Sequence, residues 1–202
     1  MKFIKYVQEI ANRKNRKRLK NTGFTIISSN CAGGFLYHWL HQRFNSPFIN
    51  LYMSNEDFLI ALSDLEKFIN TPIKEFENNE YNYPIGIGYG NTLIHFMHYN
   101  SFDEANKKWK ERCGRINWNN MFVMLTNWEG NEDILYKFDK LPYKHKVVFT
   151  NRKYASIKSA YWLRGFKKDK GIGQVYRTMN IFGKRYIDQF DYVGFFNGDL
   201  RI

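Results

Sequence analysis

The chain has 202 residues and a formal net charge of +12, with 44% hydrophobic and 18% aromatic residues. This length and apolar content fit one ordinary globular domain and exclude a disordered chain. No apolar run approaches the roughly 18 residues of a membrane span, and we recognise no signal-peptide pattern. Cys31 and Cys113 are too few for a disulfide scaffold and lack metal-ligand spacing. We therefore expect a cytoplasmic protein without a metal site.

The positive charge is concentrated at the N-terminus. The first 20 residues contain eight lysines and arginines and one acid, so they carry +7 of the +12. Four apolar residues at helical spacing predict a short amphipathic helix over residues 2–12: Phe3, Val7, Ile10 and Ala11. We divide the chain into a basic N-terminal helix or arm, residues 1–21, and a single α/β domain, residues 22–202.

Two interpretations of the basic arm remain open. Residues 2–20 could bind an anionic membrane surface, which would place a cytoplasmic protein at the inner face of the membrane. The arm could instead pack as a solvated cap on the edge of the domain. A nucleic-acid partner is the weakest alternative, because the remaining 182 residues carry only +5 and contain no recognisable reader motif.

Strand and helix patterns alternate after the arm. The apolar run 24–28 predicts a buried strand, and apolar residues within 34–44 share one helical face. A second strand is predicted over 48–53, behind Pro47. A helix with acids in its first turn is predicted from residue 54 to about residue 71.

A different pattern follows in residues 73–100. Two short apolar runs around a Gly-Asn turn predict a hairpin, and Ser101 with Glu104 forms a capping box for a helix over 102–114. Further elements are predicted as a strand over 121–126, a helix over 132–141, a strand over 146–150 and a last strand over 192–196. The alternation predicts the α/β class, with a mostly parallel central sheet flanked by helices and a β-hairpin insertion near residues 85–99.

The turn after the first predicted strand is the first candidate site. It lies at a helix N-terminus, where unpaired N–H groups and the helix dipole favour an anionic ligand. Cys31 in that field would have a lowered pKa, as a catalytic nucleophile requires. The motif is neither a Walker A loop nor a nucleophile elbow, and a tight turn with a buried, inert cysteine explains it equally. The candidate ligand-binding residues of the turn are Ser29, Asn30, Gly33 and Gly34.

His95 and His98 are the candidate general bases. Both fall on the second strand of the predicted hairpin, where their spacing sends them to opposite faces, so they are poor joint metal ligands. Either could serve as a base, and a hydrogen-bonded structural histidine is the alternative.

A third group of candidates lies farther along the chain. Arg115, Asn117 and Trp118 combine a guanidinium, an amide and an indole, which suit the binding of a sugar or a phosphate. A helix C-cap at Gly114 followed by a structural loop explains the same residues. Glu129 follows a predicted strand and is the best-placed candidate carboxylate.

Five stretches together resemble a bacterial family, the domain of unknown function numbered nineteen-nineteen. They are 29–34, 94–99, 115–120, 141–144 and 146–150, and the likeness spans about residues 22–165. Family members are often labelled exopolysaccharide biosynthesis proteins or acetyltransferases, so the resemblance implies a surface-polysaccharide setting. This chain departs from the family in having Ala32 where Trp is common and Asn119 where Asp is common.

These observations favour a transferase of cell-surface polysaccharide biosynthesis. It would move an acyl or glycosyl group, from an acyl-CoA or a nucleotide sugar, to a sugar-containing acceptor. The turn would hold an anionic group, His95 or His98 would act as base, and the Arg115 loop would orient the sugar. The alternative is a non-catalytic module that binds a sugar, a nucleotide or another anionic small molecule.

Overall fold

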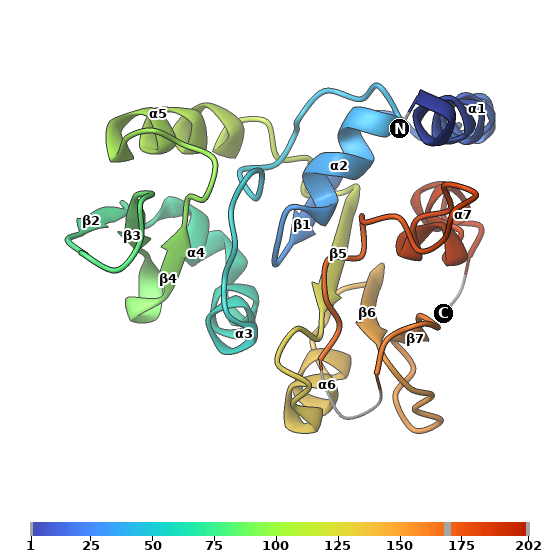
Figure 1. Ribbon diagram of the computed structural model, residues 1–202. Coiled ribbons are helices and arrows are strands. Elements are labelled where there is room, and N and C mark those ends of the chain that lie inside the picture. The colour runs from blue at the N-terminus through green and yellow to red at the C-terminus, as the bar shows by residue number, and fades with distance from the viewer. Residues whose placement is uncertain (1, 168–170, 201–202) are drawn as a thin grey trace.

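The computed structural model describes residues 2–167 and 171–200 (Figure 1). Its central sheet is parallel, with the strand order β1-β5-β6-β7: Thr25–Ser28, Met121–Thr126, Lys146–Thr150 and Ala160–Trp162. A second, antiparallel sheet has the order β2-β3-β4: Lys74–Phe76, Ile85–Ile87 and Leu93–His95. The predicted α/β class, parallel central sheet and hairpin insertion are confirmed.

The helices flank the two sheets. In the described residues they are α1 (Lys2–Arg18), α2 (Ala32–Trp39), α3 (Asn55–Ser63), α4 (Leu65–Asn70), α5 (Phe102–Cys113), α6 (Glu132–Asp139) and α7 (Tyr192–Phe196), with 3-10 turns η1 (Tyr89–Asn91) and η2 (Tyr186–Gln189). Side-chain oxygens of Ser54, Asp64 and Ser101 accept the N–H groups that would otherwise lack partners at the starts of α3, α4 and α5.

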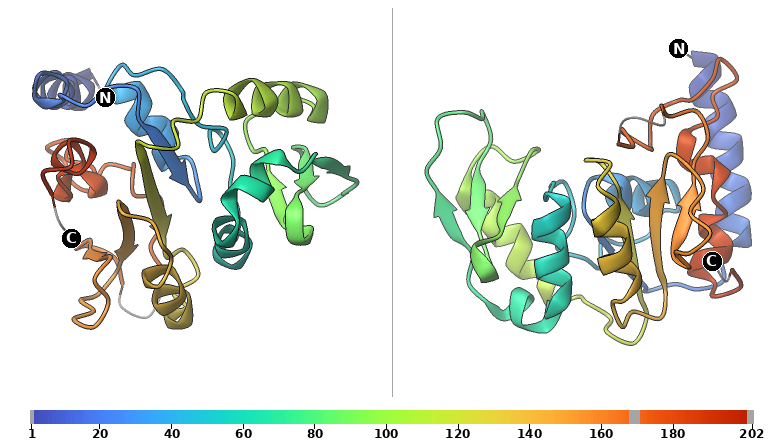
Figure 2. Two further views of the ribbon diagram at one scale, coloured as in Figure 1. Left: turned by 180° about the vertical axis from the view of Figure 1, so that it is seen from behind. Right: turned by 90° about the horizontal axis from the view of Figure 1, so that it is seen from below.

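The two faces of the central sheet bury different layers. Strand alternation sends Ile27, Val123 and Val148 to the face covered by α3 to α6. Ile26, Phe122 and Val147 point to the other face, against α2, α7 and the C-terminal segment. Figure 2 shows the antiparallel sheet and α5 on one side of the molecule and α1 and α7 on the opposite side. The central sheet therefore separates two hydrophobic cores.

The strand predicted over 48–53 is wrong. The segment is buried and runs beside the edge strand β1, where Met53 N donates to Ser29 O at 3.0 Å. Its β-bridge is made to the small sheet instead, by Tyr52 and His95, whose N–H and C=O groups bond to each other at 2.9 Å in both directions. One extended segment thus links the two sheets without joining the central one.

The last predicted strand, over 192–196, is also wrong, because this segment is α7. All five residues are buried, so the sequence shows no periodicity that separates a helix from a strand. Asp191 caps the helix by accepting a bond from Gly194 N at 3.1 Å. The helix predicted from residue 54 is two helices, because Asp64 leaves the helical conformation and caps the second.

Several element boundaries differ from the predictions. The strands over 121–126 and 146–150 are confirmed, whereas the helix predicted to reach residue 141 ends at Asp139. β2 and β7 are not among the predicted strands. The N-terminal helix continues to Arg18, well beyond residue 12. In the described part of the chain, no helix is both long and apolar enough to cross a membrane.

Candidate functional site

Three neighbouring strands end in a hydroxyl residue followed closely by asparagine. β1 leads into Ser28-Ser29-Asn30, β5 into Thr126-Asn127 and β6 into Thr150-Asn151, and every one of these side chains is buried. Since parallel strands end at the same edge, these groups form a polar layer along the carboxyl edge of the sheet. This repeat of a hydroxyl residue and an asparagine is visible in the sequence only when the three strand ends are compared with one another.

The polar layer is satisfied by contacts within the protein. Ser29 Oγ accepts from Thr126 N at 3.4 Å, and Asn30 Oδ1 accepts from Ala32 N at 2.9 Å, where it occupies the start of α2. Asn55 Nδ2 donates to Asn127 Oδ1 at 3.2 Å. Ser29 Oγ and Asn30 Oδ1, which the sequence predicted to bind a ligand, therefore accept hydrogen bonds from the protein backbone.

Burial shifts the pKa of the Cys31 thiol upward, whereas its position at a helix N-terminus predicted a downward shift. Its side chain is 4% exposed, and its Sγ points to Leu51 O at 3.8 Å. Loss of solvent raises the pKa of the thiol to about 11, although the sequence position predicted a lowered value. The thiol is therefore protonated at neutral pH.

The two glycines of the turn serve close packing. A Cβ on Gly33 would lie 3.0 Å from Ser28 Cβ and 3.1 Å from Ile26 Cγ2, so α2 approaches β1 closely at this point. Gly34 faces Ile49, 3.6 Å from where its Cβ would stand. Neither position opens to solvent.

Lys167, Gly171 and Ile172, which follow β7 in the chain, lie at the carboxyl edge of the sheet. Ile172 N donates to Asn127 O at 2.9 Å, and Asn151 Nδ2 donates to Lys167 O at 2.9 Å. A Cβ on Gly171 would lie 1.7 Å from Trp128 O, so only glycine permits this approach. These residues therefore cover part of the carboxyl edge. The exposed side chains that could bind a ligand lie beside this covered part.

An aromatic cluster lies beside this covered edge, and we define it as Tyr52, Tyr81, Tyr83, His95 and Trp128. The His95 ring centroid lies 5.6 Å from that of Tyr52, 5.3 Å from that of Tyr81 and 6.0 Å from that of Tyr83. The rings of Tyr52 and Trp128 are 6.0 Å apart. Tyr81 is 46% exposed and Trp128 38% exposed, so the cluster presents aromatic faces to solvent.

His95 is the titratable group at the centre of this cluster. Its Nδ1 lies 3.5 Å from the Tyr83 hydroxyl. Partial burial lowers the pKa of His95, against the weaker opposing effect of the Asp57 carboxylate. The imidazole is therefore neutral at pH 7, the state that can accept a proton.

Glu129 adds a carboxylate to the rim of the aromatic cluster. Its Oε1 accepts from Asn55 N at 3.0 Å, at the start of α3. Burial, with the nearby charge and hydrogen bond of Glu129, raises the pKa of Tyr52 to about 12. Glu129 follows β5, as the sequence predicted. The tyrosines around it were not predicted. Their signal in the sequence is the Tyr81-x-Tyr83-Pro84 run.

The other predicted site residues lie elsewhere. His98 follows the end of β4 in an exposed turn, so the prediction that a strand carries it to the opposite face is wrong. Asn117 N donates to Thr25 Oγ1 at 2.8 Å, at the first residue of β1. Arg115 Nη1 donates to Phe44 O at 3.4 Å, and Trp118 is 47% exposed. This loop is at the amino edge of the sheet, a strand length from the turn it was expected to assist.

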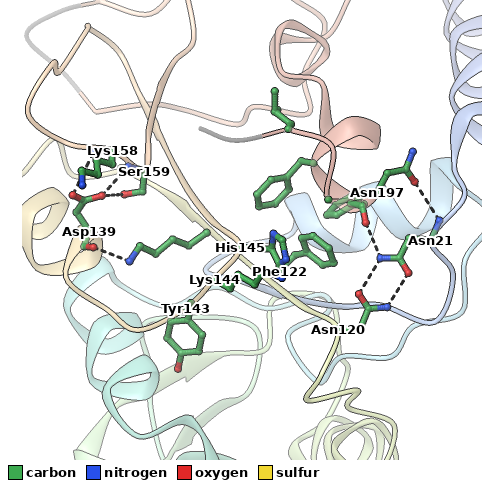
Figure 3. Close-up of a pocket in the computed structure, with 15 residues that line it drawn as sticks. Asn21, Asn120, Phe122, Asp139, Tyr143, Lys144, His145, Lys158, Ser159 and Asn197 are labelled. Carbon is green, nitrogen blue, oxygen red and sulfur yellow. Dashed lines mark hydrogen bonds between the residues drawn. The ribbon is translucent and has the colours of Figure 1, made fainter.

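A cavity of about 740 Å³ opens at the same amino edge (Figure 3). Asn21 and Asn120 exchange two amide hydrogen bonds there, each 2.9 Å long. Asp139 accepts from Ser159 N and Oγ at 2.7 and 2.6 Å. Asn21 and Asn120 thus connect the segments that lead into β1 and β5, and Asp139 and Ser159 connect the end of α6 to the start of β7. Within residues 2–167 and 171–200, no three His, Cys, Asp or Glu side chains gather as a metal site requires.

Fold and site define an α/β protein with a parallel four-stranded sheet and an aromatic cluster beside its carboxyl edge. The chain belongs to the family described as Domain of unknown function (DUF1919), whose model matches residues 2–197. The predicted family is thus confirmed, and the match includes α1 and α7. A protein of Haemophilus influenzae described as "Uncharacterized protein" is 45% identical over 187 residues, which cover 92% of this chain and 90% of that protein.

Proposed function

We propose that the protein binds a sugar-containing acceptor on the aromatic cluster and transfers an acyl or glycosyl group to it. The observation that carries this proposal is the half-buried His95, surrounded by the rings of Tyr52, Tyr81 and Tyr83. Aromatic faces with a few polar groups are typical of small-ligand sites, and the C–H face of a sugar ring packs well on them. The labels of the family that the motifs resemble supply the setting of cell-surface polysaccharide biosynthesis.

In this proposal His95 is the general base. The imidazole takes the proton of an acceptor hydroxyl, and the oxygen forms a bond to the acyl or anomeric carbon of the donor. The bond to the leaving group breaks, releasing coenzyme A or a nucleoside diphosphate. A positioned base contributes about 10²–10⁴-fold to such a rate. Glu129 and Tyr52 would orient the acceptor through the hydroxyl–carboxylate pair they form.

The test combines binding and turnover. Methyl glycosides are screened by saturation-transfer NMR, then incubated with acetyl-CoA or UDP-glucose and analysed by mass spectrometry. We expect His95→Gln to lower kcat by at least about a hundredfold with little change in KM. Tyr81→Ala should weaken acceptor binding by about tenfold, and the exposed His38→Ala on α2 is the matched control.

The pH profile gives a second readout. Because the pKa of His95 is lowered, the base stays unprotonated until the pH falls below its ordinary value of 6.5. We expect kcat/KM to be constant at neutral pH and to fall on an acid limb below 6.5. A limb above 6.5, or turnover that His95→Gln leaves unchanged, would assign the base to another group.

The exposure of Tyr81 and Trp128 also favours a second candidate, a non-catalytic sugar-binding module. This candidate requires sugar binding that Tyr81→Ala weakens, with no product from either donor class. Absence of binding by every glycoside would contradict both candidates.

A further inference from the structure

The outer face of α1 carries an apolar stripe that the fold leaves exposed. Phe3, Tyr6 and Ile10 follow one another at helical spacing and are 64%, 67% and 52% exposed. Large side chains of a soluble domain are seldom exposed together in this way without a partner.

A second segment extends this stripe. Ile181 and Phe182 are 79% and 69% exposed, in the turn before Gly183. Gln8 Nε2 donates to Gly183 O at 3.0 Å, which fixes this turn beside α1. Phe182 also lines a groove of about 400 Å³ together with Val7 and Ala11 of α1. The turn therefore places Ile181 and Phe182 beside the flank of α1 that carries Val7, Ala11 and Lys14, next to the exposed stripe.

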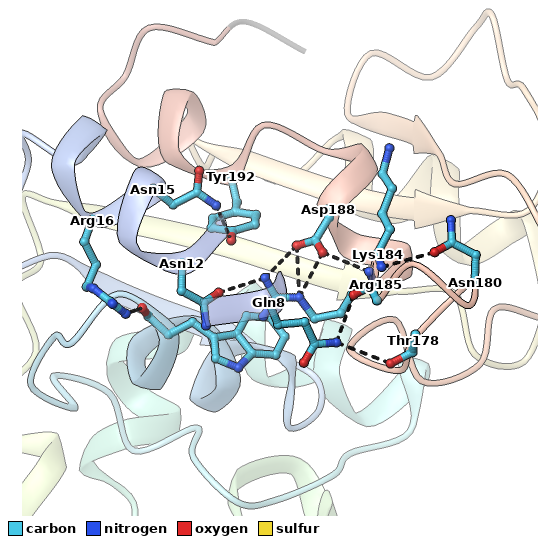
Figure 4. A network of polar contacts seen from close by, with 12 residues as sticks. Gln8, Asn12, Asn15, Arg16, Thr178, Asn180, Lys184, Arg185, Asp188 and Tyr192 are labelled. Carbon is cyan, nitrogen blue, oxygen red and sulfur yellow. Dashed lines mark hydrogen bonds and ion pairs between the residues drawn. The ribbon is translucent and has the colours of Figure 1, made fainter. Parts of the chain in front are cut away.

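A network of polar contacts fixes another face of α1 to the C-terminal part of the chain (Figure 4). Asn12 Oδ1 accepts from the buried Arg185 at 2.9 Å, and Asn15 Nδ2 donates to the Tyr192 hydroxyl at 2.6 Å. Since the inner face of α1 makes these bonds, the exposed stripe cannot be buried by a small rotation of the helix.

Basic residues continue and border the apolar stripe. Arg13, Lys14 and Lys17 prolong it toward the end of α1, and all three are exposed. Over its full length α1 contains seven lysines and arginines against Glu9, a net charge of +6. Two copies meeting through this surface would bring equal positive charges together, which disfavours a symmetric dimer.

We propose that this surface, formed by Phe3, Tyr6, Ile10, Arg13, Lys14, Lys17, Ile181 and Phe182, docks the protein on an anionic lipid membrane. The apolar side chains enter the boundary between headgroups and acyl chains, and the lysines and arginines contact lipid phosphates. This combination of an exposed apolar face and flanking cations suits a helix that lies in the membrane plane. The proposal does not depend on the function assigned to the aromatic cluster.

Vesicle flotation tests the docking surface with the full-length protein. We expect binding to phosphatidylcholine vesicles that contain phosphatidylglycerol, and little binding to phosphatidylcholine alone. Phe3→Ser with Ile10→Ser, and separately Lys14→Glu with Lys17→Glu, should each weaken binding by at least about tenfold. The matched control replaces Ile60 and Phe76 by serine, because both are exposed apolar residues outside the surface.

Circular dichroism first confirms that each variant folds. Wild-type protein that stays unbound from the anionic vesicles overturns the proposal, as does binding that either pair of substitutions leaves unchanged. A dimer in sedimentation that Phe3→Ser with Ile10→Ser dissociates would assign the surface to a second copy instead. Duplex DNA that binds in place of the vesicles would assign it to a nucleic acid.

Discussion

Arg185 is a cation in the interior of the protein. Its side chain is 1% exposed, its Nε donates to both Asp188 oxygens at 2.9 and 3.0 Å, and its guanidinium stacks 3.6 Å above the Trp39 ring. With Asn12 it joins the N-terminal helix to the C-terminal segment. Nothing in the sequence distinguishes Arg185 from the other basic residues, because burial of a charge depends on contacts between residues far apart in the chain.

Arg185→Ala should therefore destabilise the fold. Removal of the guanidinium takes the cation away from the Asp188 carboxylate, which keeps its bond from the backbone N–H of residue 185, and removes the donor to Asn12 Oδ1. We expect the free energy of unfolding to fall by about 3 kcal/mol. Urea denaturation measures this change. Arg13→Ala is the control, since the Arg13 side chain is 73% exposed and forms an ion pair with Glu9 on its own helix. Equal stabilities for the two variants would contradict the interior role of Arg185.

At the scale of the elements, the close contact between α2 and β1 depends on the absence of a side chain at Gly33. The short distance from Gly33 to Ser28 and Ile26 places the helix directly on the strand. Helix periodicity predicted α2 and strand pattern predicted β1, but their separation is a property of the packed pair.

Gly33→Ala should push α2 away from β1. The added methyl group meets buried side-chain atoms at 3.0 to 3.1 Å, so we expect a loss of about 2 kcal/mol in the free energy of unfolding. Gly114→Ala is the matched control, because its φ is −67° and the nearest atom to a Cβ would be Glu111 O at 3.9 Å. That variant should be as stable as the wild type or slightly more so, as thermal melts would show.

At the scale of the whole molecule, several acidic side chains are wholly or partly removed from solvent in their neutral form. Burial raises the pKa of Cys31 to about 11 and that of Cys113 to about 12. It also raises the pKa values of Tyr52 and Tyr143 to about 12. In the unfolded chain the thiols ionise near 9 and the tyrosines near 10, so the unfolded state loses protons first as the pH rises.

Stability should consequently fall above pH 9. Between pH 8 and 10 the two thiols account for about 3 kcal/mol of lost unfolding free energy, by the linkage between pKa and stability. Urea denaturation in high salt, which screens the net charge of +12, measures the change. Replacing both cysteines by serine should reduce the fall, and stability that is constant or rising over this interval would contradict the burial of the thiols.

The predictability of the fold follows from the length of each pattern. β5 and β6 were predicted at their observed bounds, because these short apolar runs contain the β-branched residues Val123, Val147 and Val148, which favour a strand. α7 was taken for a strand, since five buried residues carry no periodicity. Asp64 separates α3 from α4, and α6 ends at Asp139. Both boundaries depend on backbone conformations that the spacing of apolar residues does not show.

The candidate site was predictable only in part. Glu129 and His95 were named from the sequence, and they lie on the same side of the carboxyl edge, joined through Tyr52. The Arg115 loop is predicted to assist them, yet it lies at the amino edge, because a loop that leads into a parallel strand must end at the amino end of that strand. Which edge of the sheet a loop occupies follows from the direction of the chain, so the position of this loop is a property that the sequence contains.

The sequence by itself determined the family, the α/β class, most strands and helices, and the basic character of the N-terminal helix. These properties depend on composition and on patterns within short segments. The tertiary structure decided which polar groups are buried, the raised pKa of Cys31, the aromatic surroundings of His95 and the apolar surface shared by Phe3 and Phe182. Each of these depends on contacts between distant residues, because solvent exposure and electrostatic environment arise only when separate segments pack together.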